Sequence, residues 1–240
     1  MEKRFITPGK AVPSLYADIL SQPHTLIAGT TGSGKSTALA GLIYSAVALH
    51  SPARTQFVLI DPKRVDLLRF RDLPHTLKHV TEPADIVATL HNVLTVIDRR
   101  YKMMAEKGAT LFNGTDIYLI IDEIADLMTT QKKDVMPPLQ RILQIGRAAK
   151  VHVIACTQCP LSSIIGTPLM VNFTARLGLR TLCAQDSRNI LGIKGCETLP
   201  QYGKGIYMSP NGYNPVSIPM IPDASIVSML RYWNSPDCIA

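Results

Sequence analysis

The sequence has no long apolar segment. Its 240 residues contain no uninterrupted apolar run of about eighteen, the length at which a membrane-spanning helix becomes a candidate. The chain begins with the charged Met1-Glu2-Lys3-Arg4, and no apolar stretch of a secretory signal follows. We therefore expect a cytoplasmic protein without a membrane segment of its own, in which any contact with a membrane or a secretion apparatus depends on a partner.

Cysteines are few, and their spacing does not form the pattern of a disulfide framework. The five cysteines are an odd number, and only Cys156 and Cys159 form a C-x-x-C pair. A structural zinc site needs a second pair of ligands, and no further C-x-x-C or C-x-x-H occurs. Cys156 also ends the apolar run Val151–Ala155, so we interpret it as a buried strand residue. This pattern argues against a disulfide scaffold and suits a reducing compartment.

Internal repeats, low-complexity tracts and linkers are absent as well. The length and the hydrophobic content of 46% suit one large domain with a real core. We expect residues 1–240 to form a single domain, with an extended lead-in over 1–20 that includes a short helix, Ser14–Leu20, and with a C-terminal helix and tail over 222–240. The net charge of +7 is compatible with a polyanionic partner.

The segment Gly29–Ser36, GTTGSGKS, matches the phosphate-binding loop pattern G-x-x-x-x-G-K-[ST]. It lies between an apolar strand, His24–Ala28, and a predicted helix, Thr37–Leu49, which is the order that the motif requires. Lys35 is predicted to reach the β- and γ-phosphates of a nucleoside triphosphate, and the Ser36 hydroxyl to bind Mg²⁺. The predicted nucleotide-binding residues are Gly29, Thr30, Thr31, Gly32, Ser33, Gly34, Lys35, Ser36 and Thr37.

A second motif places two carboxylates at the end of a strand. The apolar run Ile117–Ile121 predicts a strand buried on both faces, and Asp122 and Glu123 follow it directly. Asp122 is predicted to hold the Mg²⁺, directly or through water. Glu123 is predicted to orient or deprotonate the attacking water.

Polar residues follow two further predicted strands. Val151–Cys156 leads into Thr157 and Gln158, and we expect the Gln158 side chain to face the γ-phosphate. Gln56–Ile60 leads into the charged segment Asp61–Leu67. Strand ends are where α/β proteins place ligand chemistry, but a solvated turn with internal ion pairs explains Asp61–Leu67 as well.

The remaining pattern predicts an α/β fold with a mostly parallel sheet, helices on both faces and a C-terminal antiparallel hairpin. Arginines and lysines near the end of the long predicted helix, among them Arg100, are interpreted as complementing the helix dipole. Further predicted strands are Thr76–Val80 and Ala175–Leu182. Further predicted helices are Pro83–Lys107, Asp134–Ala149 with Pro137 and Pro138 in its first turn, Asp186–Leu191 and Asp223–Trp233. The hairpin pairs Lys204–Met208 with Pro215–Ile218 around Pro210-Asn211-Gly212.

Together these motifs predict ATP hydrolysis with Mg²⁺. Their residues also resemble those of one protein family. The chain resembles the FtsK/SpoIIIE DNA translocases over residues 20–210, specifically their RecA-like P-loop motor domain. The matching segments occur in the family's order: Ala28–Ser36, Asp61-Pro62-Lys63, Asp122–Met128, Gly146-Arg147-Ala148-Ala149, Ala155-Cys156-Thr157-Gln158 and Asp186-Ser187-Arg188.

The resemblance implies a homo-oligomeric, hexameric ring that threads double-stranded DNA, as in conjugative transfer, a mobile element or chromosome segregation. It also implies that an arginine of a neighbouring subunit completes each ATP site. Arg147 matches the position expected for that role, with Arg176 and Arg188 as alternatives. The alternative role for Arg147 is that of a cation that interacts with helix C-terminal carbonyls.

Two departures from the family pattern weaken the expectation of a DNA grip. The family has an arginine after Thr-Gln where this chain has Cys159, and a lysine where this chain has Ala184. Both changes remove cations that could contact phosphates. The alternative function is therefore a polypeptide-moving ATPase, similar to those of type VII secretion.

Overall fold

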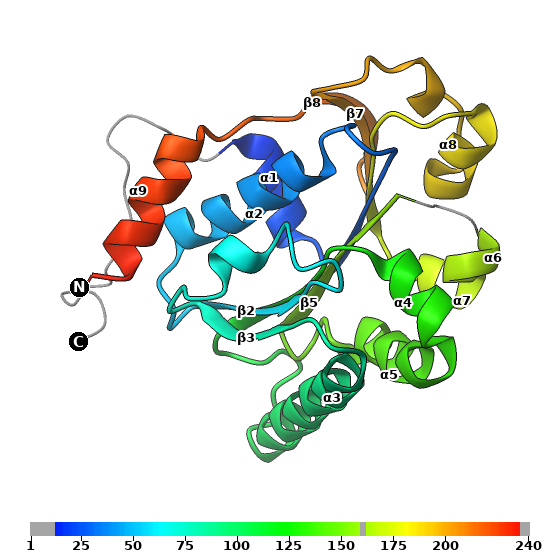
Figure 1. Cartoon of the computed structure of the whole chain (residues 1–240). Coiled ribbons are helices and arrows are strands. Elements are labelled where there is room, and N and C mark those ends of the chain that lie inside the picture. Colours follow the sequence, from blue (N-terminus) through cyan, green and yellow to red (C-terminus); the bar gives the residue numbers. More distant parts are fainter. Residues whose placement is uncertain (1–12, 159–161, 236–240) are drawn as a thin grey trace.

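The computed structural model describes residues 13–158 and 162–235, and these residues build a three-layer α/β structure (Figure 1). Within them, eight strands form one sheet in the order β3-β2-β4-β5-β1-β6-β7-β8. The parallel strands are β1 His24–Ala28, β2 Thr55–Ile60, β3 Thr76–Val80, β4 Asp116–Ile121, β5 Val151–Thr157 and β6 Ala175–Gly178. The antiparallel strands β7 Lys204–Ser209 and β8 Gly212–Ser217 complete one edge.

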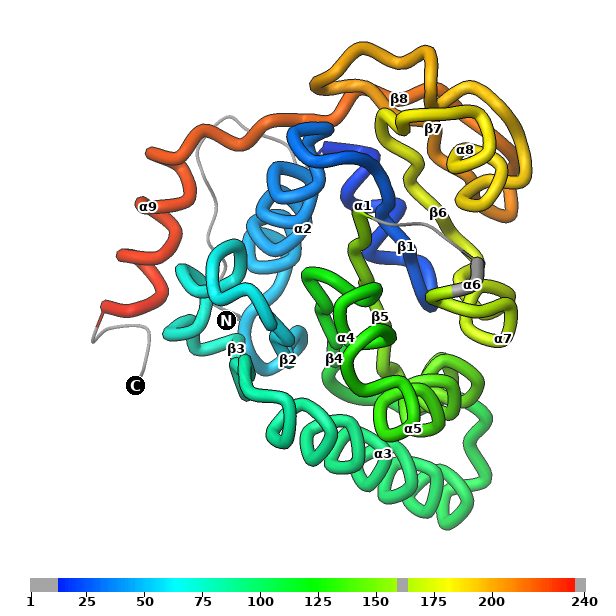
Figure 2. Tube along the Cα trace, turned by 45° about the vertical axis from the view of Figure 1, so that its right-hand side comes forward, coloured from blue at the N-terminus to red at the C-terminus, as the bar shows by residue number. Residues whose placement is uncertain are grey.

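Helices cover both faces of the sheet, as predicted. Alternate strand residues point to opposite faces, so the sheet has two hydrophobic cores. One core packs Ile27, Leu59 and Ile120 under α1 Ser14–Ser21, α2 Lys35–Leu49 and α9 Asp223–Trp233. The other packs Leu26, Val58 and Leu119 under α3 Pro83–Glu106, α4 Ile124–Thr130, α5 Lys132–Ile145 and α7 Thr167–Met170. Figure 2 shows α1, α2 and α9 on one side of the strands and α3, α4 and α5 on the other.

The region after Asp122 differs from the sequence expectation. An unpredicted helix, α4, follows Glu123, and α5 stands where the helix over Asp134–Ala149 was predicted, with Pro137 and Pro138 inside it rather than in its first turn. The helix begins earlier because the N–H groups of Asp134 and Val135 both bond to the Gln131 carbonyl. Neither proline can donate to the carbonyl four residues before it. Those carbonyls belong to exposed residues, so water can bond to them.

Two other boundaries differ in the C-terminal third. The strand predicted over Ala175–Leu182 ends at Gly178, and residues 179–182 lie beyond the carboxyl edge of the sheet. The hairpin strands are longer than predicted at the turn, since Ser209 pairs with Gly212 and leaves only Pro210 and Asn211 between them. Short helices α6 Ser162–Ile165 and α8 Ala184–Leu191 and the 3₁₀ turns η1 Leu68–Phe70 and η2 Cys196–Thr198 complete the described elements.

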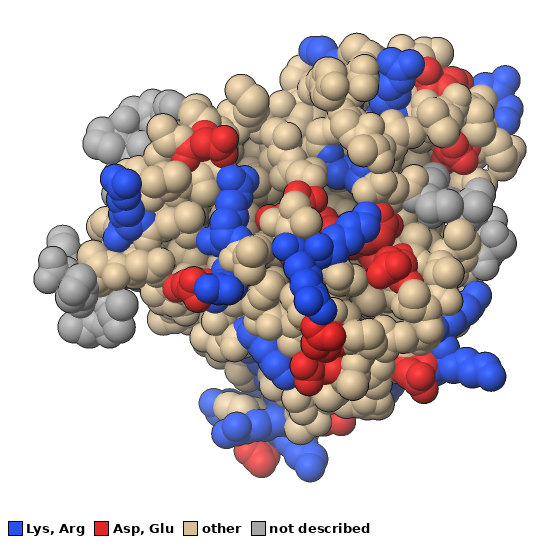
Figure 3. Space-filling view, viewed as in Figure 1, with Lys and Arg blue, Asp and Glu red and all other residues tan. Residues whose placement is uncertain are grey.

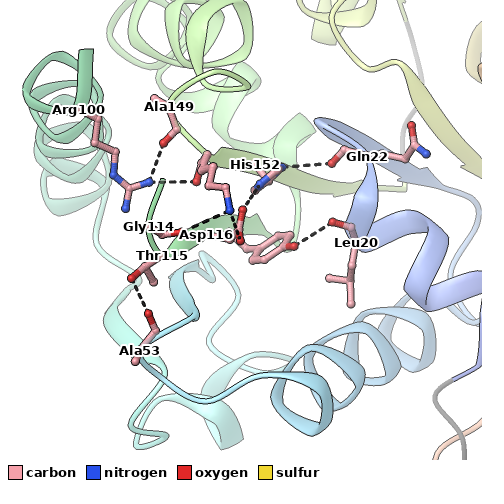
Figure 4. Close-up of polar contacts among 11 residues, drawn as sticks. Leu20, Gln22, Ala53, Arg100, Gly114, Thr115, Asp116, Ala149 and His152 are labelled. Carbon is pink, nitrogen blue, oxygen red and sulfur yellow. Dashed lines mark hydrogen bonds and ion pairs between the residues drawn. The ribbon is translucent and has the colours of Figure 1, made fainter. Parts of the chain in front are cut away.

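A polar network holds the amino ends of β4 and β5 together (Figure 4). Asp116 accepts a contact from His152 Nε2 at 3.0 Å and from Lys150 Nζ at 3.3 Å. Burial opposes the charge of Asp116, but the bond from His152 and the Lys150 charge outweigh it and lower the pKa of this carboxyl. Arg100 is buried and donates to the Ala149 carbonyl at 2.7 Å. Arg100 therefore ties α3 to the start of β5, which corrects its interpretation as an exposed partner of the helix dipole.

Candidate active site at the carboxyl edge of the sheet

Four parallel strands deliver the predicted site residues to one edge of the sheet. Gly29 directly follows the end of β1, Asp122 the end of β4, Gln158 the end of β5 and Asp61 the end of β2. Because the four strands are parallel and in register, their carboxyl ends meet. Figure 3 shows acidic and basic side chains next to one another in the hollowed centre of this face.

The loop Gly29–Gly34 has the backbone that a phosphate cradle needs. Gly32 and Gly34 have φ of 75° and 105°, a region open to glycine, and α2 starts directly after Gly34. A Cβ atom on Gly29 would lie 2.7 Å from both Leu179 Cβ and Ser33 Oγ. The loop is therefore tightly packed at its first glycine. The start of α2 points its N–H groups and the positive end of its dipole at the cradle.

The loop borders a cavity of about 270 Å³. Six of its lining residues are among the predicted nucleotide-binding residues, and two more are Asp122 and Gln158. The complete lining is Thr31, Gly32, Gly34, Lys35, Ser36, Thr37, Asp66, Asp122, Gln158 and Tyr202. The structure thus brings together two predicted site residues that are 127 positions apart, as the hydrogen bond of 2.7 Å from Thr31 Oγ1 to Gln158 Oε1 shows.

Lys35 lies along the inside of the loop. Its ammonium donates to the carbonyls of Gly29 at 2.6 Å and Thr30 at 2.9 Å. Burial lowers the pKa of Lys35, and the nearby Glu123 and Asp122 carboxyls oppose that shift. The side chain is held at the cradle as a desolvated cation, which is the form that attracts a phosphate most strongly.

Glu123 is the most constrained carboxylate of the site. It is 5% exposed and accepts the backbone N–H of Gln158 at 3.1 Å on one oxygen and 3.2 Å on the other. Lys63 Nζ lies 3.1 Å from its Oε2 atom. The end of β5 and the segment after β2 therefore both hold this side chain in place.

Asp122 lies beside two other carboxyls. Burial, followed by the charges of Asp66 and Asp61, raises the pKa of Asp122 to about 7. Asp66 also accepts the Ser36 hydroxyl at 2.6 Å. Ser36, Asp66 and Asp122 present hydroxyl and carboxylate oxygens, the ligands that Mg²⁺ prefers. The donor set and the unfavourable proximity of the carboxyls both fit a divalent cation at this position.

Arg147 lies at the opposite edge of the sheet. It is exposed in the turn before β5, where it lines a cavity of about 370 Å³ together with Asp116, Lys150 and His152. The 7 residues of β5 separate it from Gln158, a length of roughly 20 Å. Arg147 therefore does not meet the phosphate loop of its own chain.

The two alternative arginines differ sharply from each other. Arg176 is committed to its own fold, since its guanidinium donates to the carbonyls of Phe173, Ile190 and Met170 at 2.7–3.2 Å. Arg188 is exposed on α8. The position of Cys159 lies outside the described residues, so the proposed loss of a loop cation there has no structural description. Ala184 is the first residue of α8.

Sequence reasoning missed several residues that line the site. Lys63 and Asp66 come from the charged segment after β2, for which strand-end position was a signal, and their contacts favour the ligand-site interpretation of that segment. Arg180 was placed inside a strand, yet it lies in the loop after β6. It lines a second cavity of about 490 Å³ with Thr30, Thr31, Gln158, Leu182 and Gln201. No sequence signal marks Tyr202, which is 67% exposed at the phosphate loop.

Comparison with known proteins places this fold in a class, the RecA-like P-loop ATPases. The chain is similar to the type VII secretion ATPase EccC of Thermomonospora curvata, with a TM-score of 0.74 and 25% identity over 88% of this chain and 28% of that one. It is also similar to the pCW3 conjugation coupling protein TcpA, solved with ATPγS, with a TM-score of 0.76 and 19% identity over 90% of this chain and 66% of that one.

The family follows from the sequence comparisons. The FtsK/SpoIIIE family model matches residues 11–117. DNA translocase FtsK is 30% identical in Rickettsia prowazekii, over 91% of this chain and 35% of that protein, and 33% identical in Agrobacterium fabrum, over 93% and 30%. The chain belongs to the FtsK/SpoIIIE family, and it spans about a third of the length of these curated relatives. Among the described residues, no helix is both long and apolar enough to cross a membrane.

Proposed function

We propose that this chain is an ATP-hydrolysing motor that translocates double-stranded DNA. The observation that carries the proposal is the meeting of Lys35, Ser36, Asp122 and Gln158 around one cavity, with Glu123 fixed beside it. The relatives named DNA translocase support DNA as the polymer that is moved. The basic balance of the chain agrees with a polyanionic substrate.

In this mechanism the protein groups divide into three roles. The loop N–H groups, Lys35 and Thr37 would bind the phosphates, and Ser36 and Asp122 would hold Mg²⁺, with Asp66 orienting the Ser36 hydroxyl. When bound there, Mg²⁺ would supply positive charge that offsets negative charge on the transferred phosphoryl group. Glu123 accepts a proton from, or orients, the attacking water, and Gln158 contacts the γ-phosphate end.

The position of Arg147 supports an oligomeric ring, which we propose to be a homohexamer. An arginine at the amino edge of the sheet reaches a nucleotide only across a subunit interface. Such an arginine is worth a factor of about 10³–10⁵ in rate when it acts in trans. ATPase activity per subunit should therefore rise with protein concentration until the ring is assembled.

The test is the ATPase rate against protein concentration, with and without duplex DNA, for the wild type and Lys35→Ala. We expect a rate that rises more than linearly with concentration, that duplex DNA stimulates and that Lys35→Ala abolishes. A wild type that hydrolyses ATP at one rate with or without duplex DNA contradicts DNA translocation and leaves the ATPase assignment intact.

The second candidate is a polypeptide-moving ATPase. The similarity to EccC, a type VII secretion ATPase, and the residues Cys159 and Ala184 favour it. Binding of many phosphates weakens steeply as salt rises. Duplex binding that is undetectable even at low salt would favour polypeptide over DNA.

A further inference from the structure

The turn that carries Arg147 is anchored along its whole backbone. We call residues 145–150, which lead from the end of α5 to β5, the Arg147 turn. Every backbone carbonyl of this turn accepts a hydrogen bond from the protein. The donors are, in chain order, the Tyr101 hydroxyl, the N–H groups of Val151, Lys150 and Phe112, Arg100 Nη1, and Arg100 Nη1 again together with the Ile117 N–H. The backbone of the turn is therefore held by α3, by the loop before β4 and by the two strands.

Lys150 closes the Arg147 turn in a strained conformation. Its φ is 54°, in the left-handed region that favours glycine, and in the described part of the chain Arg64 is the only other non-glycine residue with a positive φ. Such a conformation persists where the surrounding structure enforces it. Here the Lys150 ammonium lies 3.3 Å from Asp116 Oδ2 and 3.4 Å from the Gly114 carbonyl. The side chain of Lys150 thus anchors the end of the turn to the start of β4.

Arg100 supplies a second anchor from α3. It is buried, and its Nη1 group donates to the carbonyls of Ala149 at 2.7 Å and Lys150 at 3.2 Å. Figure 4 shows Arg100 extending from its helix to Ala149. Its guanidinium also lies 4.4 Å from the centre of the Phe112 ring, and the Phe112 N–H donates to the Ala148 carbonyl at 2.9 Å. Arg100 therefore holds the second half of the turn both directly and through Phe112.

The Arg147 side chain takes no part in this anchoring. It is exposed, and within residues 13–158 and 162–235 its guanidinium has no hydrogen bond or ion pair. The chain thus fixes the backbone from which Arg147 projects and leaves its charged group available. This combination suits an arginine that acts on another subunit, because catalysis requires a cation at a defined place.

We propose that Arg100 and Lys150 are positioning residues for Arg147, and that they set the place from which its guanidinium enters the nucleotide site of a neighbouring subunit. This inference rests on the proposed role of Arg147 in ATP hydrolysis. A misplacement of about 1 Å can lower an enzyme rate by about a hundredfold, so a loosened turn is enough to slow hydrolysis. The buried arginine of α3 and the strained lysine thereby acquire a role beyond folding.

A double-mutant cycle separates positioning from folding. The variants of the whole chain are Arg100→Ala, Arg147→Ala and the two combined, and the measurements are kcat in the assembled ring and the Kd for ATP. Arg100→Ala should lower kcat about ten- to a hundredfold and leave the Kd unchanged. The double variant should be no slower than Arg147→Ala, because Arg100 then has nothing to position. Arg99→Ala, at an exposed position on the same helix, should match the wild type.

Lys150→Gly provides a second test that does not depend on a buried arginine. Glycine adopts the φ of residue 150 without strain but lacks the ammonium that contacts Asp116. We expect the free energy of unfolding to stay near the wild-type value while kcat falls about tenfold. Lys150→Arg should retain more activity than Lys150→Gly, since it keeps a cation beside Asp116.

The possible failures are distinguishable. Losses that multiply in the Arg100→Ala, Arg147→Ala double variant, or full activity in Lys150→Gly, overturn the positioning role and leave the proposed function in place. Wild-type activity in Arg147→Ala overturns the role of Arg147 in hydrolysis and this inference with it.

Discussion

The ammonium of Lys63 lies 3.1 Å from the carboxylate of Glu123, a residue that follows a different strand 60 positions further along the chain. Lys63 is 41% exposed at its side chain and Glu123 only 7%. The contact therefore fixes a buried carboxylate from the solvent side, while the Gln158 N–H fixes it from the other. Two strands other than its own thus position the proposed water-activating group.

Removing the ammonium of Lys63 should slow ATP hydrolysis without weakening ATP binding. We expect Lys63→Ala to lower kcat on the order of tenfold, because misplaced reacting groups are costly in rate, and to leave the Kd for ATP unchanged. Lys63→Arg should retain most of the activity. Steady-state kinetics and nucleotide titration make the comparison, with the exposed Lys102→Ala on α3 as control. An unchanged kcat in Lys63→Ala would show that the Gln158 N–H suffices.

Measurements of stability and of ATPase activity should distinguish the roles of the candidate arginines. Arg176→Ala should lower the free energy of unfolding by about 2–4 kcal/mol, because three backbone carbonyls lose a charged donor. Arg147→Ala, at an exposed position, should change stability by less than about 0.5 kcal/mol but reduce ATPase activity by about a thousandfold if it acts in trans.

Mixing variants then tests whether Arg147 acts across an interface. Arg147→Ala keeps an intact loop and Lys35→Ala keeps an intact arginine, so a mixture of the two should regain part of the activity that each lacks alone. Arg99→Ala, at an exposed position on α3, serves as the matched control. No recovery on mixing, in a preparation shown to form mixed assemblies, argues against the role of Arg147.

Alanine substitutions at two glycines of the phosphate loop should destabilise the protein for different physical reasons. A Cβ on Gly34 meets nothing within 4 Å, so Gly34→Ala carries only the strain of a φ of 105°, about 1–3 kcal/mol. Gly29→Ala should destabilise the fold more, because the new Cβ would clash with Leu179 and crowd the backbone of Arg180, so that both would have to move away from the loop. Both should weaken ATP binding. Gly108→Ala is the matched control, since Gly108 also has positive φ and open space but lies in a distant loop.

Acid should destabilise the fold through buried histidines. Burial lowers the pKa of His75 to about 4 and that of His24 to about 3, from an ordinary 6.5. Between pH 6.5 and 4 the unfolded chain binds protons that the folded chain does not, so stability falls as pH falls through that window. For His75 alone the loss is on the order of 3 kcal/mol.

Denaturant unfolding at pH 7 and pH 4.5 measures this dependence. His75→Phe should reduce the dependence and leave the part due to His24, because the new ring keeps the edge contact with Trp233 but takes up no proton. The exposed His91→Gln should leave the pH dependence as in the wild type. A wild-type profile that is flat between these pH values would mean that other groups compensate.

Much of the fold was predictable because its signals are local. Short buried strands such as His24–Ala28, the helical stripe of Pro83–Glu106 and the glycines of the phosphate loop depend on neighbouring residues. The start of α5 was misplaced because a proline indicates the first turn of a helix only when the residues before it are not already helical, and here the N–H groups of Asp134 and Val135 bond to the Gln131 carbonyl. The end of β6 was misplaced because the apolar Leu179 still donates its N–H to the Ala28 carbonyl, as a strand residue would. The chain beyond Leu179 then turns over the phosphate loop.

The sequence by itself determined the phosphate loop, the acidic strand end and the resemblance to one motor family, because those depend on residue type and short spacing. Only the tertiary structure decided which distant groups complete the site. Lys63 and Asp66 became part of it because β2 runs parallel to β4 and ends at the same edge. Arg147 lies at the opposite edge of the sheet and Arg100 lies inside the fold, because strand direction and helix packing fix where a side chain lies. The neighbouring residues in the sequence do not determine either of these.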